Sequence, residues 1–462
     1  MRSLPLLAIA LWLSTPELAA QNRGRRGGPP PGAEAPPPAA EPAPAKTDAP
    51  AKPKRYQAIV GGDVYLGTGA RLAGATVLLA DDKIEAVGHN LDLPEGTVRH
   101  DAKGKTVCPG FVAVLGTGMG APRSAPFVDG VNPFDPEIKQ GLAAGVTSFL
   151  AGSPGGGAMP TGGNAVVKLA YGSVAEMVLQ EDSVVGMTVP LSLADREKFT
   201  ETVQKAREYL LALDDFPKKK AADPNAKEPA MPQGGDKVVA ILRGKARLWV
   251  SVGSSSFNPF GGGGGRRGGG GSKANDTDGI RQALELSRLL GKGVVLQKPT
   301  SAWLVPDEIA ATGSMAILSP RDRLPADPSD PDRTGTNLAS AAILAAAGVP
   351  VAVTCPQGLM AGVGVGTGGI MGQDLNTPHL DAAFAVRGGL DNRKALRTIT
   401  LDAARMIGAE HRIGSLEPGK DADVLILDGD PLHYATFVTT AFVNGKVVYE
   451  KDREPLYNHI TR

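Results

Sequence analysis

The chain has 462 residues, a formal net charge of +1 and an apolar content of 42%. This length accommodates one large domain and a smaller one, with enough apolar side chains for a sizeable core. The near-neutral charge and the aromatic content of 5% argue against a nucleic-acid partner, which needs a basic surface or a base-stacking platform.

The first twenty residues are typical of a secretory signal peptide. Arg2 supplies the positive end, residues 4–13 are mostly apolar, and Leu18-Ala19-Ala20 suits a cleavage site. The apolar run is too short to span a bilayer as a helix, so no membrane span is expected. We therefore expect export to a periplasm or to the cell exterior. Residues 21–54 are rich in Pro, Ala, Gly and Arg, which predicts a disordered linker.

Strand-like alternation of apolar and polar residues begins at Tyr56 and returns near the C-terminus in "TTAFVNGKVVYE". Turn residues such as Asp81-Asp82-Lys83 separate the first apolar runs. The pattern predicts that residues 55–108 and 412–450 together build one composite β-sandwich domain.

Between these two segments, β-type apolar runs alternate with helical patterns. One helix is predicted over residues 278–290, capped by Thr277 or Asp276. Eight strands with intervening helices over residues 109–411 predict an α/β fold, a (β/α)8 TIM-type barrel. The expected strands cover residues 111–115, 146–150, 165–169, 184–189, 248–252, 294–296, 315–318 and 349–353.

Two insertions interrupt the predicted barrel. Residues 214–236 are polar and contain several prolines, which predicts a surface loop. Residues 253–275 contain "GGGGGRRGGGG" and follow the fifth strand. A mobile lid carrying Arg266 and Arg267 is one interpretation of the second insertion. A neutral flexible insert is the interpretation we favour, because glycine loses the most entropy on ordering.

The two cysteines, Cys108 and Cys355, are predicted to remain unpaired. The first precedes the first expected barrel strand and the second follows the last one. At about 3.3 Å per strand residue, the two ends of a barrel lie roughly 20 Å apart, which is beyond the reach of a disulfide.

Several segments, in this order along the chain, resemble the amidohydrolase superfamily, and in particular its imidazolonepropionase-like, exported branch. The longest is "ALRTITLDAARMIGAEHRIGSLEPGKDADVLILDGDPL", residues 395–432. Others are "VNPFDPEIKQGLAAGVTSF", "GGNAVVKLAYGSVAEMVL" and "AAFAVRGGL". The resemblance extends from Tyr56 to Glu450. It implies a barrel flanked by a composite β domain, and hydrolysis of non-peptide or dipeptide C–N bonds with one or two zinc or similar divalent ions.

In that family the metal ligands lie at the C-terminal end of the barrel, where the metal makes hydroxide from water and an Asp moves the proton. The ligands are a His-x-His motif, a carboxylate or modified lysine, two further histidines and that Asp. The corresponding positions of this chain carry other residues: Leu115, Thr117, Leu191, Ser251, Lys298 and Pro356, with Gln297 in place of a Glu and with Cys355 as the alternative to Pro356 if the register shifts by one.

The histidine content points the same way. The chain has six histidines, and only His379 lies between residues 110 and 407. Placing a dication beside the apolar side chains of Leu115 and Pro356 would be unfavourable by several kcal/mol. The charge of Lys298 would also repel the ion. We therefore predict no metal and no other cofactor.

The remaining polar residues leave alternatives open. Cys355 and Lys298 form either a metal-free nucleophilic pair or a plain pocket lining, since a nearby ammonium lowers a thiol pKa. Ser251 with Lys298 is a weaker version of the same hypothesis. His379 is either a lone base or the cap of a loop. Lys168 is interpreted as a structural lysine rather than a carboxylated metal bridge.

Three classes of function follow. The first, which we favour, is a non-catalytic binding or partner subunit that keeps the amidohydrolase scaffold. It would act as a homo-oligomer or pair with an active amidohydrolase relative, around a small-molecule ligand that the sequence does not identify. The second is an active hydrolase of C–N bonds with an atypical, metal-free site. The third is an exported structural or scaffold protein.

Overall fold

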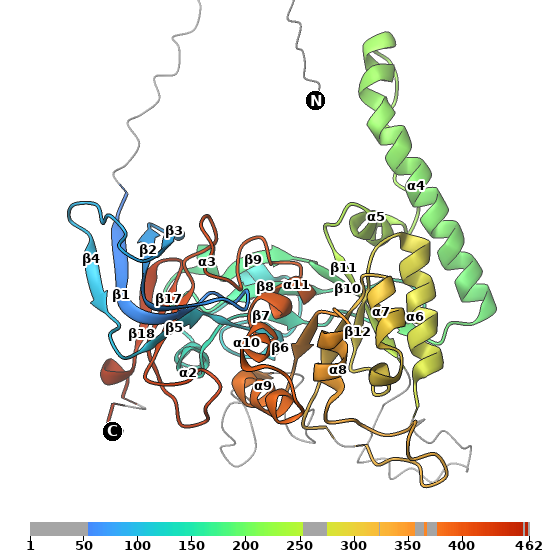
Figure 1. The fold of residues 1–462 in the computed structure, drawn as a ribbon. Coiled ribbons are helices and arrows are strands. Elements are labelled where there is room, and N and C mark those ends of the chain that lie inside the picture. The colour runs from blue at the N-terminus through green and yellow to red at the C-terminus, as the bar shows by residue number, and fades with distance from the viewer. Residues whose placement is uncertain are drawn as a thin grey trace, which may run out of the picture. The chain divides into compact units, whose positions relative to one another are not determined.

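The computed structural model describes most of the chain from Lys54 onward (Figure 1). The described residues are 54–252, 275–322, 324–355, 365–366, 377–455 and 458–460. The predicted signal peptide, nearly all of the predicted linker, the glycine-rich insert up to residue 274 and Pro356 lie outside them. Export and the lid hypothesis therefore stay predictions.

Strands from both ends of the described chain form one eight-stranded sheet, with the order β18-β17-β16-β5-β1-β2-β3 and β4 paired with β1. The junction is the antiparallel pair β5–β16, in which Cys108 lies opposite Leu425. In Figure 1 the blue strands from the start of the described chain and the red strands β17 and β18 from its end lie in the same part of the molecule. The strands are β1 (Tyr56–Tyr65), β2 (Arg71–Ala80), β3 (Lys83–Gly88), β4 (Val98–Asp101), β5 (Thr106–Pro109), β16 (Val424–Leu427), β17 (Val438–Val443) and β18 (Lys446–Glu450).

A second sheet is entirely parallel and has the order β10-β11-β12-β13-β14. Its strands are short apolar runs, and most of their residues are buried. Such continuous apolar runs are typical of parallel strands that are covered on both faces. The strands are β10 (Val184–Val189), β11 (Arg247–Val252), β12 (Val295–Gln297), β13 (Met315–Leu318) and β14 (Val351–Val353).

The third sheet has the order β15-β6-β7-β8-β9 and is mixed. Strands β15, β6 and β7 are parallel, whereas β8 is antiparallel to both β7 and β9. Parallel neighbours need a long crossover, usually a helix, and residues 153–163 between β7 and β8 contain none. The strands are β6 (Phe111–Thr117), β7 (Val146–Gly152), β8 (Asn164–Lys168), β9 (Val178–Glu181) and β15 (Val365–Gly366).

The α/β class is confirmed, but the described strands do not close into one eight-stranded ladder. The backbone N–H groups of Val112 in β6 and Val353 in β14 donate to the carbonyls of Ile399 and Thr398, at 2.7 and 3.4 Å. Residues 398–399 therefore lie between these two strands. At the other seam, the Asn164 side chain donates to the carbonyl of Val184 at 2.7 Å. The expectation of eight parallel barrel strands is wrong for β8.

Helices follow many of the strands (Figure 1). In the described part of the chain, no helix is long and apolar enough to cross a membrane. The helices of at least six residues are α2 (Glu137–Ala143), α4 (Leu193–Ala222), α5 (Asp236–Leu242), α6 (Thr277–Leu290), α7 (Pro306–Ala311), α8 (Ser340–Ala346), α9 (Pro378–Arg387), α10 (Asn392–Arg397) and α11 (Leu401–Met406). Single turns are α1 (Phe127–Gly130), α3 (Val174–Met177), η1 (Ala302–Leu304) and η2 (Lys451–Arg453).

The expected surface loop over residues 214–236 is only partly a loop. Residues 214–222 continue α4, which runs on through Pro217. Lysine and alanine, which follow this proline, are among the stronger helix formers. The buried residues of α4 are Phe199, Val203 and Ala206, all in its first half. The remainder of the expected insertion, residues 223–235, connects α4 to α5.

One apolar cluster joins the two five-stranded sheets to α11. Trp249 of β11 is fully buried in it, and its indole N–H donates to the carbonyl of Met406 at 2.7 Å. Helix α11 thus packs against strands of both sheets. The cluster includes Val112, Val114, Leu150, Val166, Val184, Trp249, Val295, Ile317, Ala352, Ala403, Ala404 and Met406.

A buried charge cluster connects β8 to the eight-stranded sheet. The Nζ of Lys168 lies 2.9 Å from Asp421 Oδ2 and 2.9 Å from Asp423 Oδ2, the latter at angles outside those of a hydrogen bond. The same amine donates to the side chain of Asn444. Asp421 also accepts from Arg412 at 2.8 Å. Lys168 is therefore held as a structural cation, in agreement with its interpretation as a structural lysine.

Replacing Lys168 by Met is expected to lower the free energy of unfolding by about 3–5 kcal/mol, because it leaves Asp423 charged or protonated in a buried site without its cation. Lys219→Met, on the exposed end of α4, is the matched control and should stay within about 0.5 kcal/mol of the parent. Urea unfolding at neutral pH measures both. Equal losses in the two variants would contradict a structural role for the cluster.

The same cluster predicts a loss of stability in acid. Burial by itself would raise the pKa of Asp421, but Lys168, Arg412 and Lys83 outweigh it and hold that pKa at about 2. Because an unfolded Asp has a pKa of about 3.9, this carboxylate stabilises the fold above that pH. The contribution disappears as the pH falls from about 4 to about 2.

We expect Asp421→Asn to remove this contribution, which amounts to about 2–3 kcal/mol above pH 4. The difference in unfolding free energy between parent and variant should therefore shrink as the pH falls from about 5 to about 2.5. Burial, and to a smaller extent the charge of Asp421, raise the pKa of the neighbouring Asp423, so the contribution of Asp423 has the opposite sign. A difference that is constant with pH would show that Asp421 is not ionised in the folded protein.

Candidate functional site

The C-terminal ends of β10 to β14 meet at one edge, because all five strands are parallel. In α/β barrels and open α/β sheets, functional side chains collect at this edge. We call it the mouth and define it by the titratable side chains that lie shortly after these strands in the described part of the chain. They are Lys298 after β12, Arg321 and Asp322 after β13, and Cys355 after β14, with Asp381 of α9 against them.

Lys298 has an unusual backbone conformation. Its N–H continues the ladder by donating to the carbonyl of Ile317 at 2.8 Å, yet its φ is +46°. Among the described non-glycine residues with positive φ, the others are Asp or Asn apart from Met119, and Asn and Asp tolerate this region best. Pro299 follows and restricts the backbone further. Such strained positions cluster at functional sites.

The charged groups of the mouth form two pairs. Arg321 donates to both carboxylate oxygens of the fully buried Asp381, at 2.9 and 3.0 Å. The Nζ of Lys298 lies 3.9 Å from Asp322 Oδ2, at the limit of an ion pair, and its side chain is 27% exposed. The first pair is closed and bidentate, whereas the second leaves the amine room for another partner.

Burial lowers the pKa of Lys298, against the opposing effects of Asp322, Cys355 and Asp381. Burial raises the pKa of the Cys355 thiol, and Asp381 raises it further. Burial also raises the pKa of Asp381, although Arg321 opposes this. The amine of Lys298 is therefore easier to deprotonate than that of a free lysine, and the thiol of Cys355 stays protonated.

These shifts bear on the hypothesis of a nucleophilic pair. The structure does bring Cys355 and Lys298 into one electrostatic cluster, as that hypothesis requires. However, the thiolate is the reactive form of cysteine, and this thiol is kept protonated. Lys298, and not Cys355, is the side chain that the mouth makes more nucleophilic.

Two positions that correspond to family metal ligands, Ser251 and Leu191, form hydrogen bonds within the protein. The hydroxyl of Ser251 donates to Gln297 Oε1 at 2.6 Å across the β11–β12 pair. Leu191 is buried, and its backbone N–H donates to the side chain of Gln282 in α6 at 2.6 Å. The hydroxyl of Ser251 is therefore already bound by Gln297, and Leu191 offers only an apolar side chain.

Leu115 and Thr117 lie on β6, as expected. Leu115 is partly buried against the interior apolar cluster. Thr117 pairs with Gly366 of β15, where a Cβ atom on the glycine would come within 2.9 Å of the threonine Oγ1. A strand from the segment that follows β14 therefore lies directly against the end of β6.

His379 does not join Lys298 and Cys355. It is the second residue of α9, and its ring lies 6.2 Å from the ring of Phe111, the first residue of β6. Burial lowers the pKa of His379 to about 4. The residue is therefore neutral at pH 7 and packs near the start of β6 rather than with the mouth residues. Pro356 lies outside the described residues.

Sequence reasoning missed Arg321, Asp322 and Asp381. Arg321 and Asp322 follow an expected barrel strand within "LSPRDR", so a search for charged residues after every strand would have found them. The search was instead restricted to positions that match the family's metal ligands. Asp381 gives no such signal, because it lies inside a helix.

The residues at the ligand positions do not fit a divalent metal. In the part of the chain that the structure describes, no three His, Cys, Asp or Glu side chains gather as a metal site. At two of these positions the polar groups are the Ser251 hydroxyl, which is bound to the Gln297 amide, and the Lys298 amine. Zinc prefers thiolate, imidazole and carboxylate ligands, so these side chains offer it nothing suitable.

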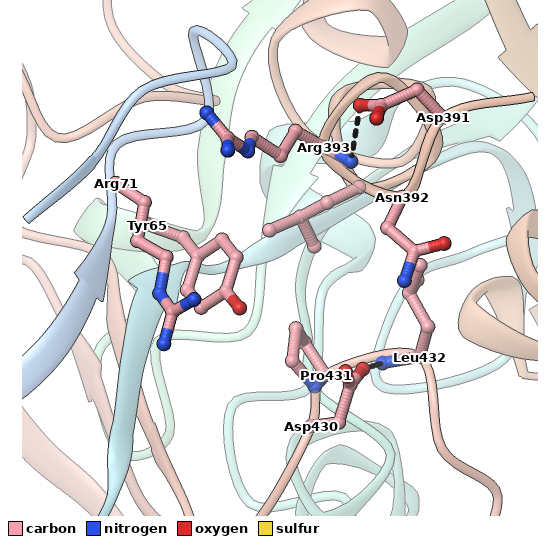
Figure 2. Close-up of a pocket in the computed structure, with 9 residues that line it drawn as sticks. Tyr65, Arg71, Asp391, Asn392, Arg393, Asp430, Pro431 and Leu432 are labelled. Carbon is pink, nitrogen blue, oxygen red and sulfur yellow. Dashed lines mark hydrogen bonds between the residues drawn. The ribbon is translucent and has the colours of Figure 1, made fainter.

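A separate pocket of about 410 Å³ lies away from the mouth, between β1, α10 and the loop at residues 430–432 (Figure 2). Its polar groups mostly serve the local fold. Arg71 pairs with Asp63, Asp391 accepts from the N-terminal N–H groups of α10, and Asp430 accepts from Leu432. Figure 2 shows the last two carboxylates beside the backbone that they bind. The pocket therefore adds no reactive group.

Both cysteines are free and buried, as predicted. We expect neither Cys108 nor Cys355 to be alkylated by iodoacetamide in the native protein at about pH 8, because burial keeps both thiols protonated and shielded. Both should react without any reductant in concentrated guanidinium chloride, and adding dithiothreitol should change nothing. Mass spectrometry counts the adducts. Rapid native alkylation of Cys355 alone would restore the hypothesis of a nucleophilic thiol.

Comparisons with known proteins find a family match over part of the chain and a similar fold over most of it. The model of the amidohydrolase family matches residues 286–449. Over 71 residues the chain is 37% identical to the 5-methylthioadenosine/S-adenosylhomocysteine deaminase of Symbiobacterium thermophilum, a match that covers 12% of this chain and only 16% of that relative. An amidohydrolase from Thermotoga maritima MSB8 has a similar structure, with a TM-score of 0.58, 23% identity, and 85% of this chain and 100% of the other covered. The A. niger ochratoxinase has a TM-score of 0.48 at 14% identity, with 88% and 98% covered. Residues 286–449 thus match the amidohydrolase family, and most of the chain shares its fold with the Thermotoga maritima protein.

Proposed function

We propose that this protein keeps the amidohydrolase scaffold but works without a divalent metal, as a binding or partner subunit whose ligand enters the mouth. Its two five-stranded sheets would correspond to the family's (β/α)8 barrel, and its eight-stranded sheet to the composite β domain. The family match supports the scaffold, and the side chains of the mouth support the absence of metal chemistry.

The observation on which the proposal rests is the contact between Ser251 and Gln297 beside Lys298. These three residues stand at the ends of β11 and β12, where the family presents imidazole and carboxylate groups. The hydroxyl and the amide satisfy each other, and the amine is a potential cation. A dication would find no imidazole or carboxylate at these three positions and would face a positive charge whenever Lys298 is protonated.

A metal-free hydrolase is the second candidate, because Lys298 and Cys355 do share one cluster. It has less support, since burial holds the thiol in its unreactive form. An exported scaffold without any ligand is the third, and the strained backbone of Lys298 argues against it.

Export and oligomer formation are part of the proposal. Export is supported by the N-terminal sequence alone. The partner would be either a second copy or an active amidohydrolase relative, and only the active relative would supply catalysis. Native co-purification tests the partner, and a strict monomer without any partner would count against it.

Metal analysis and hydrolysis assays test the proposed function. We expect far less than one equivalent of zinc per chain after purification from zinc-supplemented medium, and no hydrolysis of dipeptides or cyclic amides above background. Added zinc should not shift the melting temperature, whereas a ligand at 100 times its Kd stabilises a native protein by about 2.7 kcal/mol. Stoichiometric, tightly bound zinc would overturn the proposal.

The quadruple variant Leu115→His/Thr117→His/Ser251→His/Lys298→His is the matched positive control. It restores imidazoles at four ligand positions, and we expect its zinc content to rise towards one equivalent if it folds, which circular dichroism checks. Zinc uptake by the variant but not by the parent would show that the side chains, and not the scaffold, exclude the metal.

A further inference from the structure

We infer that Lys298 traps carbonyl compounds: its Nζ adds to the aldehyde or ketone group of a small molecule and holds it at the mouth as an imine. The inference rests on the proposed function, because a mouth without a metal leaves this amine available. It gives the proposed binding site a ligand class, which the family resemblance does not.

The first argument is position. Lys298 immediately follows β12, at the edge where the parallel strands present their functional side chains. Its backbone is held at a φ of +46° by a ladder hydrogen bond on one side and Pro299 on the other. A strained backbone persists only where the surrounding structure enforces it. Here it fixes the direction in which a long, otherwise flexible side chain leaves the sheet.

The second argument is the state of the amine. A lysine adds to a carbonyl only in its neutral form, and desolvation is the usual means of producing that form near neutral pH. Burial lowers the pKa of Lys298. The groups that oppose this are Asp322 after β13, Cys355 after β14 and Asp381 in α9. Two of these three groups have only a weak raising effect on the pKa of Lys298. Cys355 is a neutral thiol, and the carboxylate of Asp381 is bound by Arg321.

The third argument is the charge balance, which does not favour a simple anion. Arg321 is fully engaged with Asp381 through two hydrogen bonds. When Lys298 is protonated, Asp322 lies 3.9 Å away and balances it. The mouth thus has no excess positive charge among its described residues. What it offers a ligand is the lone pair of an amine.

The reaction is balanced without any oxidant or reductant. The lone pair of Nζ forms a bond to the carbonyl carbon, and the product is a carbinolamine. Its C–O bond then breaks as the C=N bond forms, and the oxygen leaves as water with the two protons that the amine has lost. Asp322, near Nζ, is placed to carry a proton from the nitrogen to the oxygen. Water reverses the reaction and releases the ligand.

Reductive trapping tests the inference. The full-length protein is treated with acetaldehyde and sodium cyanoborohydride near pH 7, and the ethyl adducts on each lysine are measured over time by peptide mass spectrometry. Lys292 is the internal control, because it is exposed and lies in the turn that leads into β12. Each unit by which a pKa falls raises the neutral fraction about tenfold. Because burial lowers the pKa of Lys298, we expect it to react faster than Lys292.

Two variants and one condition complete the design. Lys298→Arg keeps the charge and should eliminate the fast adduct, whereas Lys292→Arg should leave the rate at Lys298 unchanged. In concentrated guanidinium chloride the two lysines should react at equal rates, which shows that the fold causes the difference. With rising pH, labelling of Lys298 should level off earlier in the native protein than in the unfolded one.

Equal or slower labelling of Lys298 in the native protein would overturn the inference. Zinc analysis of the same sample separates the two proposals. A zinc-free protein with an unreactive Lys298 refutes only the trapping of carbonyl compounds. Stoichiometric zinc with an unreactive Lys298 refutes the proposed function as well.

Discussion

The fold depends on a lysine ammonium that is buried between two carboxylates. Lys168 ends β8, whereas Asp421 and Asp423 precede β16, more than 250 residues later in the chain. A buried charge is tolerated only when opposite charges and hydrogen bonds surround it, so these segments cannot separate without exposing an unpaired ion. Because β16 pairs with β5, and β5 leads directly into β6, the cluster also fixes where the first strand of the mixed sheet begins.

This arrangement separates stability from chemistry. In the Lys168 cluster and at Trp249, nearly all polar groups have a partner within the protein. These two regions position the strands. At the mouth, the groups differ in how firmly they are bound. Arg321 and Asp381 form a closed pair, whereas Lys298 has a long ion pair and a strained backbone. A site that binds a ligand needs polar groups that are not fully paired within the protein. A rigid scaffold can tolerate the free energy that such groups cost.

Periodicity and turn residues located the eight expected strand segments and the helix that ends at Leu290. They did not give the direction of β8, because an apolar run such as "NAVVK" does not show whether the strand runs parallel or antiparallel to its neighbours. The helix-free loop before it was the available signal. The helix at residues 214–222 was missed because Pro217 was taken as a loop signal. In the site, Lys298 was identified from the family pattern, but Asp381 acts through a tertiary contact that no local pattern records.

The residues at the family's ligand positions differ in what they leave unsatisfied, and this difference is the strongest reason to focus on Lys298. Ser251 is bound to Gln297, the N–H of Leu191 to Gln282, and Thr117 lies against β15. Each of these positions has become part of the fold. If Lys298 were equally structural, a relaxed backbone and a short ion pair would stabilise the mouth better. Its strain and desolvation cost free energy that packing alone does not require, and a reactive amine accounts for both.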